Sequence, residues 1–392
     1  MTNQNIPKIR FKGFDNNWET GIELNDTIEK QFKGKARQEQ LNEGVVMYLD
    51  ANTLNGNTPF LSNAEADTDS KDILIMWDGS NAGKVFTGFE GALGSTLKGY
   101  KVKDENDSYF IFNYLVKYQK KIYEQYRTPN IPHVIKNFTE VFKVSLPSLP
   151  EQSAIGTLFQ TLDELLSAYK DNLANYQAFK ATMLTKMFPK AGQTTPEIRL
   201  DGFDGEWEEK KLGELAEIVR GASPRPIQDP KWFDGSSEVG WLRISDVTNQ
   251  NGRIYDLEQR ISELGQEKTR VLKEPHLLLS IAASVGKPVI NYVQTGVHDG
   301  FLIFLNPIFD KEFMFQWLEM FKDGWNKYGQ SGSQVNLNSD IVKNHKLKVP
   351  TLNEQHAIGA FFANLDDLIS SYQAKITELE TLKKKLLQDM FV

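Results

Sequence analysis

The chain has 392 residues, of which 40% are hydrophobic and 25% charged, and a net charge of −7, values typical of a soluble protein with two or three domains. It has no cysteine, which excludes disulfides and thiolate metal sites and favours a reducing compartment. Because we find neither an apolar signal region nor a stretch approaching 18 apolar residues, we expect a cytoplasmic protein with no membrane partner.

Two similar entry motifs divide the chain into halves. Residues 6–19 read I-P-K-I-R-F-K-G-F-D-N-N-W-E and residues 195–208 read T-P-E-I-R-L-D-G-F-D-G-E-W-E, at an offset of 189. Later segments match at an offset of 203, so the second half has 14 more residues (203 − 189) in its interior. The chain is therefore a tandem repeat.

The interior of each half is rich in Gly, Asn, Thr and aromatic residues. Short β-like runs occur at 45–48, 73–77, 241–244, 277–279 and 301–305, separated by turn residues. We expect one internal helix in each half, at 107–126 and 310–328, whose aromatic residues belong to a core. These patterns predict two compact α+β domains.

Several polar residues are candidates for contacts with phosphates or base edges. Gly83-Lys84 and Gly286-Lys287 correspond in the two halves, and a Gly followed by a Lys suits a phosphate contact, although a plain hairpin with an exposed Lys is the alternative. Polar loops at 126–133 and 329–336 suit base edges or phosphates, or are only loops. The candidates are Lys84, Arg127, Asn130, His133, Arg225, Lys287, Ser333, Gln334 and Asn336.

Long amphipathic helices are predicted at 147–188 and 350–391, with the same apolar spacing in both. About 38 residues give a rod of about 57 Å, so we expect a spacer. Apolar residues seven apart form a seam typical of helices that pair with each other. The seam residues are Ile155, Leu162, Tyr169, Tyr176 and Met183 in the first helix, and Ile358, Leu365, Tyr372, Leu379 and Leu386 in the second.

Catalytic motifs are missing from the sequence. It has no G-x-x-x-x-G-K-[ST] phosphate loop, and its five histidines lack metal-ligand spacing. Asn306-Pro307-Ile308-Phe309 differs from the N-P-P-F of amino-methyltransferases and follows no glycine-rich cofactor motif. We expect a protein that is not an enzyme and binds no metal. Its net acidity argues mildly against nucleic acid, although basic clusters occur near residues 30–37, 117–127 and 220–231.

The repeated motifs resemble those of the specificity (S) subunit of type I restriction-modification systems. The resemblance rests on P-x-L-x-E-Q-x-x-I-G at 147–156 and 350–359, on the entry motifs, on G-A-S-P-R-P at 221–226 and on W-L-R-I-S-D-V at 241–247. It implies an α+β fold with two target recognition domains, joined by two long antiparallel coiled-coil helices in a pseudo-two-fold tandem repeat. The first half shows no clear G-x-S-P-R-P. The expected segments are recognition domain 1 with its entry motif at 1–146, a spacer helix at 147–190, recognition domain 2 with its entry motif at 191–349, and a spacer helix at 350–392.

The same resemblance implies a function in DNA recognition. Each domain would read one half of an asymmetric bipartite site in double-stranded DNA, with the helices setting the spacing. Two modification subunits that use S-adenosylmethionine to methylate adenine, and two restriction subunits that use ATP and Mg²⁺, would be the partners, and this chain would hold no cofactor. The alternatives are a coiled-coil scaffold that does not bind DNA, and a stand-alone nuclease or methyltransferase.

Overall fold

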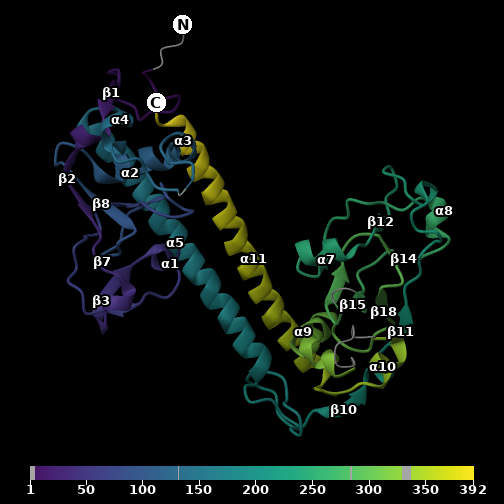
Figure 1. The fold of residues 1–392 in the computed structure, drawn as a ribbon. Helices are drawn as coiled ribbons and strands as arrows, with labels where there is room; N and C mark the ends of the chain where they lie inside the picture. Colours follow the sequence, from purple (N-terminus) through teal and green to yellow (C-terminus); the bar gives the residue numbers. More distant parts are fainter. Residues whose placement is uncertain (1–4, 131, 283–284, 329–336) are drawn as a thin grey trace. The chain divides into compact units, whose positions relative to one another are not determined.

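A computed structural model describes residues 5–130, 132–282, 285–328 and 337–392 (Figure 1). The chain forms two compact units, each made of one globular head and half of each long helix. The first unit contains Met1–Asp171 and Gln373–Val392, and the second contains Asn172–Tyr372. Both mix strands and helices, which confirms the α+β prediction.

The head of the first unit is built on two sheets and a closing strand pair. The four-stranded sheet has the order β2-β8-β5-β6, with β2 at Ile28–Lys33, β8 at Leu97–Val102, β5 at Ile73–Met76 and β6 at Val85–Phe86. The three-stranded sheet has the order β4-β3-β7, with β4 at Leu61–Ser62, β3 at Glu43–Leu49 and β7 at Ala92–Leu93. The antiparallel pair of β1 (Glu19–Glu23) and β9 (Lys143–Leu146) brings the entry motif to the start of the long helix.

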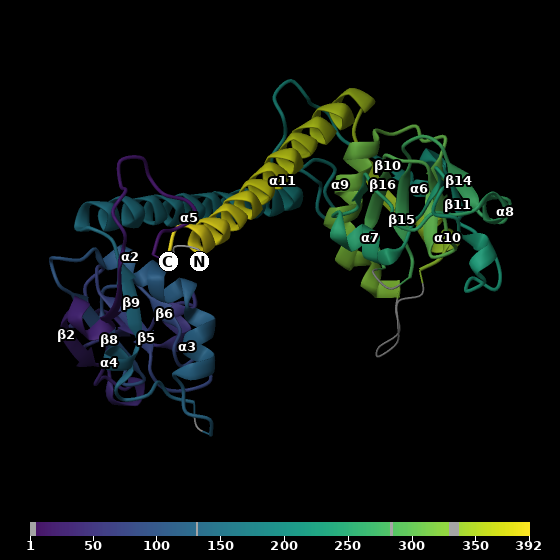
Figure 2. The ribbon, with the colours of Figure 1, turned by 90° about the horizontal axis from the view of Figure 1, so that it is seen from above.

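Short helices complete this head. They are α1 (Ala51–Leu54), α2 (Ser108–Lys117), α3 (Gln119–Gln125) and α4 (Phe138–Val141), with 3₁₀ turns η1 (Leu24–Thr27) and η2 (Gln38–Gln40). Helix α2 lies beside the long helix α5, on the side of the strands (Figure 2). The single helix predicted at 107–126 is therefore two helices. The break falls at Tyr118, after which the Gln119 side chain donates to the carbonyl oxygen of Gly83.

The head of the second unit has the same plan with one more strand. Its five-stranded sheet has the order β11-β18-β15-β16-β13, with β11 at Glu217–Arg220, β18 at Phe301–Leu305, β15 at Leu277–Ser280, β16 at Pro288–Asn291 and β13 at Arg253–Ile254. Its three-stranded sheet has the order β12-β17-β14, with β12 at Gly240–Trp241, β17 at Thr295–Val297 and β14 at Arg270–Leu272. Strands β10 (Glu208–Lys211) and β19 (Lys346–Val349) form the closing pair.

The helices of this head are α6 (Leu212–Leu215), α7 (Ile244–Asn249), α8 (Glu263–Gln266), α9 (Lys311–Phe321) and α10 (Ser339–Asn344), with 3₁₀ segments η3 (Pro230–Trp232) and η4 (Lys322–Tyr328). Two expectations fail here. The helix predicted at 310–328 changes from α to 3₁₀ geometry at Lys322. The strand predicted at 241–244 stops at Trp241, because the Asp246 carboxylate accepts the backbone N–H of Arg243 at 2.9 Å and starts α7.

The two long helices are present as predicted, α5 at Leu149–Lys186 and α11 at Leu352–Asp389. They pair antiparallel within each unit. In the first unit Lys170 pairs with Glu380 and Asp163 with Lys383. In the second the rings of Tyr176 and Tyr372 lie 5.2 Å apart. All ten predicted seam residues are buried or half-buried.

Each head takes its core from both long helices. In the first, Ile155 and Phe159 from the start of α5 pack with Phe391, which follows the end of α11. In the second, Ile358 and Phe362 from the start of α11 pack with Phe188, which follows the end of α5. Because these buried aromatic and aliphatic groups come from segments far apart in the chain, neither head can complete its core from consecutive residues.

Candidate nucleic-acid interface

The two repeated motifs meet in a buried ion pair at the base of each head. Arg10 of the entry motif donates through Nε and Nη2 to the two carboxylate oxygens of Glu151, both at 2.7 Å. Arg199 makes the same two bonds to Glu354, both at 2.8 Å. The hydrogen bonds to these carboxylates raise the pKa of Arg10 and of Arg199. A planar guanidinium facing a carboxylate fixes both position and angle, so the pair locks each entry motif to its long helix.

The next residues of the helix motif hold an internal helix in place. Gln152 accepts the backbone N–H of Asp107 at 3.1 Å and donates to the carbonyl oxygen of Pro147 at 3.0 Å. The Asp107 carboxylate caps α2 by accepting the Phe110 N–H at 2.8 Å. A Cβ on Gly156 would collide with that carboxylate, which explains the glycine. Gln355, Asp310 and Gly359 repeat the arrangement. The entry motif, the start of the long helix and the internal helix are therefore joined at the base of each head, and we call these joined parts the frame.

The structure identifies a first-half counterpart of G-A-S-P-R-P. The Gly221 N–H donates to the carbonyl oxygen of Phe301 at 2.9 Å, and the Gly34 N–H donates to that of Leu97 at 3.0 Å. A Cβ on either glycine would collide with the carbonyl oxygen of His298 or of Gly94, respectively. The segment G-K-A-R-Q at 34–38 therefore takes the place of 221–226. Sequence comparison missed it because only the glycine and a following basic residue are shared.

In the second head, hydrogen bonds hold the segment 221–226 and the neighbouring Arg220 against the turn at Asp299. Ser223 donates to one carboxylate oxygen of Asp299 at 2.8 Å and Arg225 to the other at 2.5 Å, while Arg220 donates to its carbonyl oxygen at 2.6 Å. Burial opposes ionisation of Asp299, but the bond from Ser223 and the charges of Arg225 and Arg220 outweigh it, and its pKa is lowered. Arg270 donates to the Arg220 carbonyl oxygen at 2.8 Å. Arg220 and Arg225 thus both bind Asp299, and Arg270 is joined to them through the backbone of Arg220.

In the first head two of the predicted loops come together. The backbone of His133 forms a bridge with Asp78, and Arg127 donates to the carbonyl oxygens of Ser80 and Tyr123, at 3.1 and 3.0 Å. The Arg127 guanidinium also lies 4.6 Å from the centre of the Tyr123 ring. These bonds occupy several of its donors in joining the 78–84 turn to α3. Asn130 is exposed in the loop that follows.

The two Gly-Lys turns are held by packing at the glycine. Gly83 and Gly286 have positive φ angles of 92° and 83°, and a Cβ would press on Ile122 or Trp325. Lys84 donates to Asn55 at 2.5 Å. Lys287 is half-buried, and burial lowers its pKa, as the nearby Lys322 does, while Glu319 raises it. The glycines are thus explained by the fold, and contact of either lysine with DNA stays a prediction. Ser333, Gln334 and Asn336 lie outside the described residues.

Another basic group gathers beside the 78–84 turn. The Lys98 ammonium lies 3.3 Å from the centre of the Trp77 ring, and Lys33 lies 3.9 Å from Asp78. Burial and the charge of Lys33 lower the pKa of Lys98. Lys98 and Arg270 could not be predicted as site candidates, because the sequence does not distinguish them from the other basic residues in and beside their strands. Only the fold shows that Lys98 lies next to the segment 34–38 and Arg270 next to the segment 221–226.

None of the helices in the described ranges is long and apolar enough to cross a membrane. Nor do the described residues contain a group of three or more His, Asp or Glu side chains that could hold a metal ion.

Comparison with known proteins gives the family. The model for the type I restriction modification DNA specificity domain matches twice, at residues 16–200 and 204–381. The chain is 27% identical over 408 residues to the type I restriction enzyme MjaVIII specificity subunit of Methanocaldococcus jannaschii, covering 98% of this chain and 94% of that protein. It is 22% identical over 302 residues to the putative MjaX specificity subunit of the same organism, covering 73% and 67%.

Solved structures share the fold. A type I restriction-modification S subunit from M. genitalium aligns with a TM-score of 0.69 at 17% identity and covers 99% of both chains. A chain from a structure of type I restriction-modification complex assembly aligns with a TM-score of 0.54 at 15% identity, covering 97% of this chain and 99% of that one. With the family's domain matched in both halves, the chain belongs to the type I restriction-modification DNA specificity family.

Proposed function

We propose that this chain is the DNA sequence-recognition subunit of a type I restriction-modification complex, and that each head reads one half of an asymmetric bipartite site. The observation that carries the proposal is the double match to the DNA specificity domain, one in each half. The two heads share a frame but differ in the loops that the frame presents. Two different readers on one scaffold predict a target with two different halves.

Both heads supply the cationic side chains that such reading needs. Cationic groups lie in or beside the segments 221–226 and 34–38. They belong to Arg220, Arg225 and Arg270 in the second head, and to Lys33 and Lys98 in the first. Arginine is suited to bidentate contacts with guanine and with phosphates. We propose these five residues as DNA-contacting, together with Lys84, Arg127, Asn130, His133 and Lys287. The last five and Arg225 were candidates from the sequence. Ser333, Gln334 and Asn336 remain candidates.

Catalysis belongs, in this proposal, to other subunits. Two modification subunits would bind S-adenosylmethionine and methylate adenine, and two restriction subunits would use ATP and Mg²⁺. The paired helices α5 and α11 would dock the modification subunits. A net charge of −7 fits a chain that shares its DNA contacts with partners that supply further positive charge.

Exchange of one head tests the proposal. Residues 20–145 would be replaced by the corresponding domain of another family member, and adenine methylation by the complex would be mapped across the host genome. We expect one half of the methylated motif to change and the other to stay. A change in both halves, or in neither while the complex is active, would contradict the assignment. The scaffold alternative predicts no salt-dependent DNA affinity even with partners present.

A further inference from the structure

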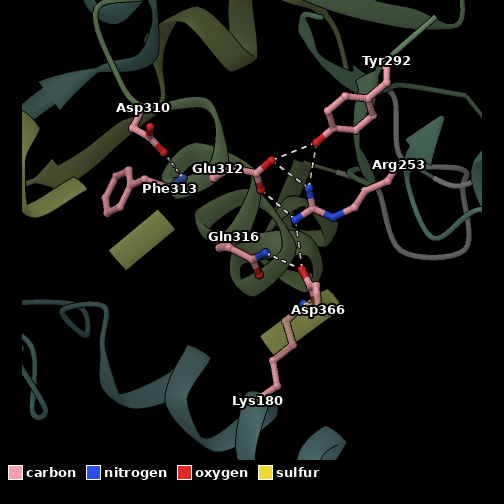
Figure 3. A network of polar contacts seen from close by, with 8 residues as sticks. All are labelled: Lys180, Arg253, Tyr292, Asp310, Glu312, Phe313, Gln316 and Asp366. Atoms are coloured by element: carbon pink, nitrogen blue, oxygen red, sulfur yellow. Dashed lines mark hydrogen bonds and ion pairs between the residues drawn. The ribbon is translucent and has the colours of Figure 1, made fainter. Parts of the chain in front are cut away.

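A network of ion pairs joins the second head to both long helices (Figure 3). Arg253 on β13 faces Glu312 on α9, with Nη1–Oε1 and Nη2–Oε2 distances of 2.8 and 2.7 Å. Its Nη2 also donates to Oδ2 of Asp366 on α11 at 3.0 Å. Asp366 in turn pairs with Lys180 on α5. One arginine of the head therefore reaches both helices through a single carboxylate.

The network is shielded from water and its charges balance. The side chains of Arg253, Asp366, Lys180 and Glu312 are 13%, 15%, 17% and 26% exposed. Two cations face two carboxylates, and Gln316 donates to Asp366 at 2.8 Å. Burial opposes the charge of Arg253, but the hydrogen bonds that it donates to Glu312 and the negative charges of Glu312 and Asp366 raise its pKa, so it stays ionised. A bidentate, largely buried arginine holds its partners at a defined angle.

The first unit repeats only part of this network. Asp163 and Lys383 stand where Asp366 and Lys180 stand, at the offset of 203, and also pair. The position of Glu312 is occupied by Tyr109, whose hydroxyl donates to Asp163 at 2.7 Å. Among the described residues of the first unit, the four-stranded sheet has no strand in the place of β13. The shared fold therefore forms without an arginine at this point, and Arg253 adds a tie that the fold itself does not require.

The Arg253–Asp366 contact lies away from the base of α11, and this position determines how it restrains the head. Both units hold their internal helix at the base of the long helix, through Gln152 in the first and Gln355 in the second. Asp366 lies 11 residues beyond Gln355 (366 − 355), which is about 16 Å along the helix axis. Gln316 of α9 and Arg253 of β13 both bind Asp366 there, so Arg253 adds the sheet to a contact that α9 already makes, and this further contact resists rotation of the head about its base.

We propose that Arg253 is a positioning residue that fixes the angle of the second head on the paired helices and so limits the spacing allowed between the two DNA half-sites. This inference rests on the proposed function. Successive base pairs advance the duplex by about 3.4 Å. A head freed to rotate about its base could therefore accept a spacer one base pair longer or shorter.

Arg253→Met tests the inference in the complete methyltransferase complex. Plasmids would carry both half-sites unchanged, with the spacer at its natural length or one base pair shorter or longer, and the methylated fraction of each would be measured at limiting enzyme. We expect methylation of the off-length sites relative to the natural site to rise about tenfold, the effect of losing one coupling interaction. The sequences of the half-sites should not change.

Two further variants sharpen the experiment. Arg260→Met removes an arginine that donates to the Ser237 carbonyl oxygen at 3.0 Å, within the same head, and it should keep the natural spacing. Arg253→Met with Glu312→Gln removes the head's cation and anion together and leaves Asp366 paired with Lys180. It should relax spacing as the single variant does, without leaving a buried carboxylate uncompensated.

The outcomes separate the inference from the proposed function. An active variant complex with unchanged spacer preference overturns the role of Arg253. Loss of methylation at every spacer in both Arg253 variants, with Arg260→Met active, assigns Arg253 to folding and likewise overturns it. If the unaltered complex methylates no bipartite site, the proposed function itself fails.

Discussion

At the scale of single residues, the frame depends on buried charge that is fully paired. Glu151 and Glu354 are each 1% exposed, and each receives two bonds from an arginine more than 100 residues away in the chain. Removing one partner of such a pair leaves a buried charge without compensation, which costs far more than losing a surface pair.

Arg10→Met should lower the free energy of unfolding of the first unit by about 3 kcal/mol. The matched control is Lys8→Met, because Lys8 is 82% exposed and 3.5 Å from Asp389, and such surface pairs contribute about 0–1 kcal/mol. The unfolding free energies of both variants would be measured by urea unfolding, and hydrogen exchange of the β5 amides would assign the change to the first unit. Equal losses in the two variants would show that the Arg10–Glu151 pair does not hold the frame.

A buried histidine predicts a pH dependence. His345 lies among the rings of Trp317, Phe321 and Trp325, and burial, aided by the charge of Lys327, lowers its pKa to about 4. The unfolded chain, with a histidine pKa of about 6.5, binds more protons than the folded chain between these values. Stability is therefore fully present above pH 6.5 and falls as the pH drops toward 4.

Lowering the pH from 7 to 4.5 should cost the second unit about 2 kcal/mol through His345. His345→Phe, which keeps the aromatic packing and removes the titration, should lose correspondingly less over the same range. Urea midpoints of both proteins at the two pH values give the comparison. Identical pH dependence in the two proteins would refute the assignment to His345.

At the scale of elements, glycines let the long helices approach the internal helices. Gly156 on α5 and Gly359 on α11 lie against the capping carboxylates of α2 and α9. Alanine is the better helix former by about 1 kcal/mol, so a simple propensity argument predicts that alanine at these positions stabilises the protein. The packing predicts the opposite.

Gly156→Ala should destabilise the first unit by about 2 kcal/mol, because the new Cβ displaces the Asp107 cap. Thr157→Ala, at the next and exposed position, should change stability by less than about 0.5 kcal/mol. Thermal unfolding gives the stabilities, and faster exchange of the α2 amides would locate the effect. Stabilisation by Gly156→Ala would mean that the cap can shift at little cost.

At the scale of the whole molecule, each long helix starts at one head and ends in the core of the other, an arrangement that we call the exchange of helix ends. Phe391 completes the core of the first head, 5.1 Å from the ring of Phe110. Phe188 completes the core of the second, 5.5 Å from the ring of Phe313. Each head is thus closed by the end of the helix that starts at the other.

Phe391→Ala should destabilise the first unit, and Phe188→Ala the second, each by about 4 kcal/mol through the cavity left behind. Hydrogen exchange of β5 and β8 reports on the first unit, and that of β15 and β18 on the second. Each variant serves as the control for the other. If both variants weakened the same unit, the exchange of helix ends would be wrong.

Features that depend on local interactions could be predicted from the sequence, whereas those that depend on distant segments could not. The long helices and their seam were predicted because periodicity is local and occurs twice at one offset. The internal helices were predicted as single elements, yet they break at Tyr118 and Lys322. Those breaks depend on contacts with other segments, such as the bond from Gln119 to the 78–84 turn, which no local pattern records.

The sequence by itself determined the doubled plan, the helical spacer, the family and the motifs, since each is a pattern repeated along the chain. Only the tertiary structure showed that the arginine of each entry motif binds the glutamate of each helix motif, that 34–38 takes the place of 221–226, and that Arg253 ties a head to both helices. These contacts join residues that are far apart in the chain, and the sequence around a charged residue or a glycine does not show which distant residue it will contact.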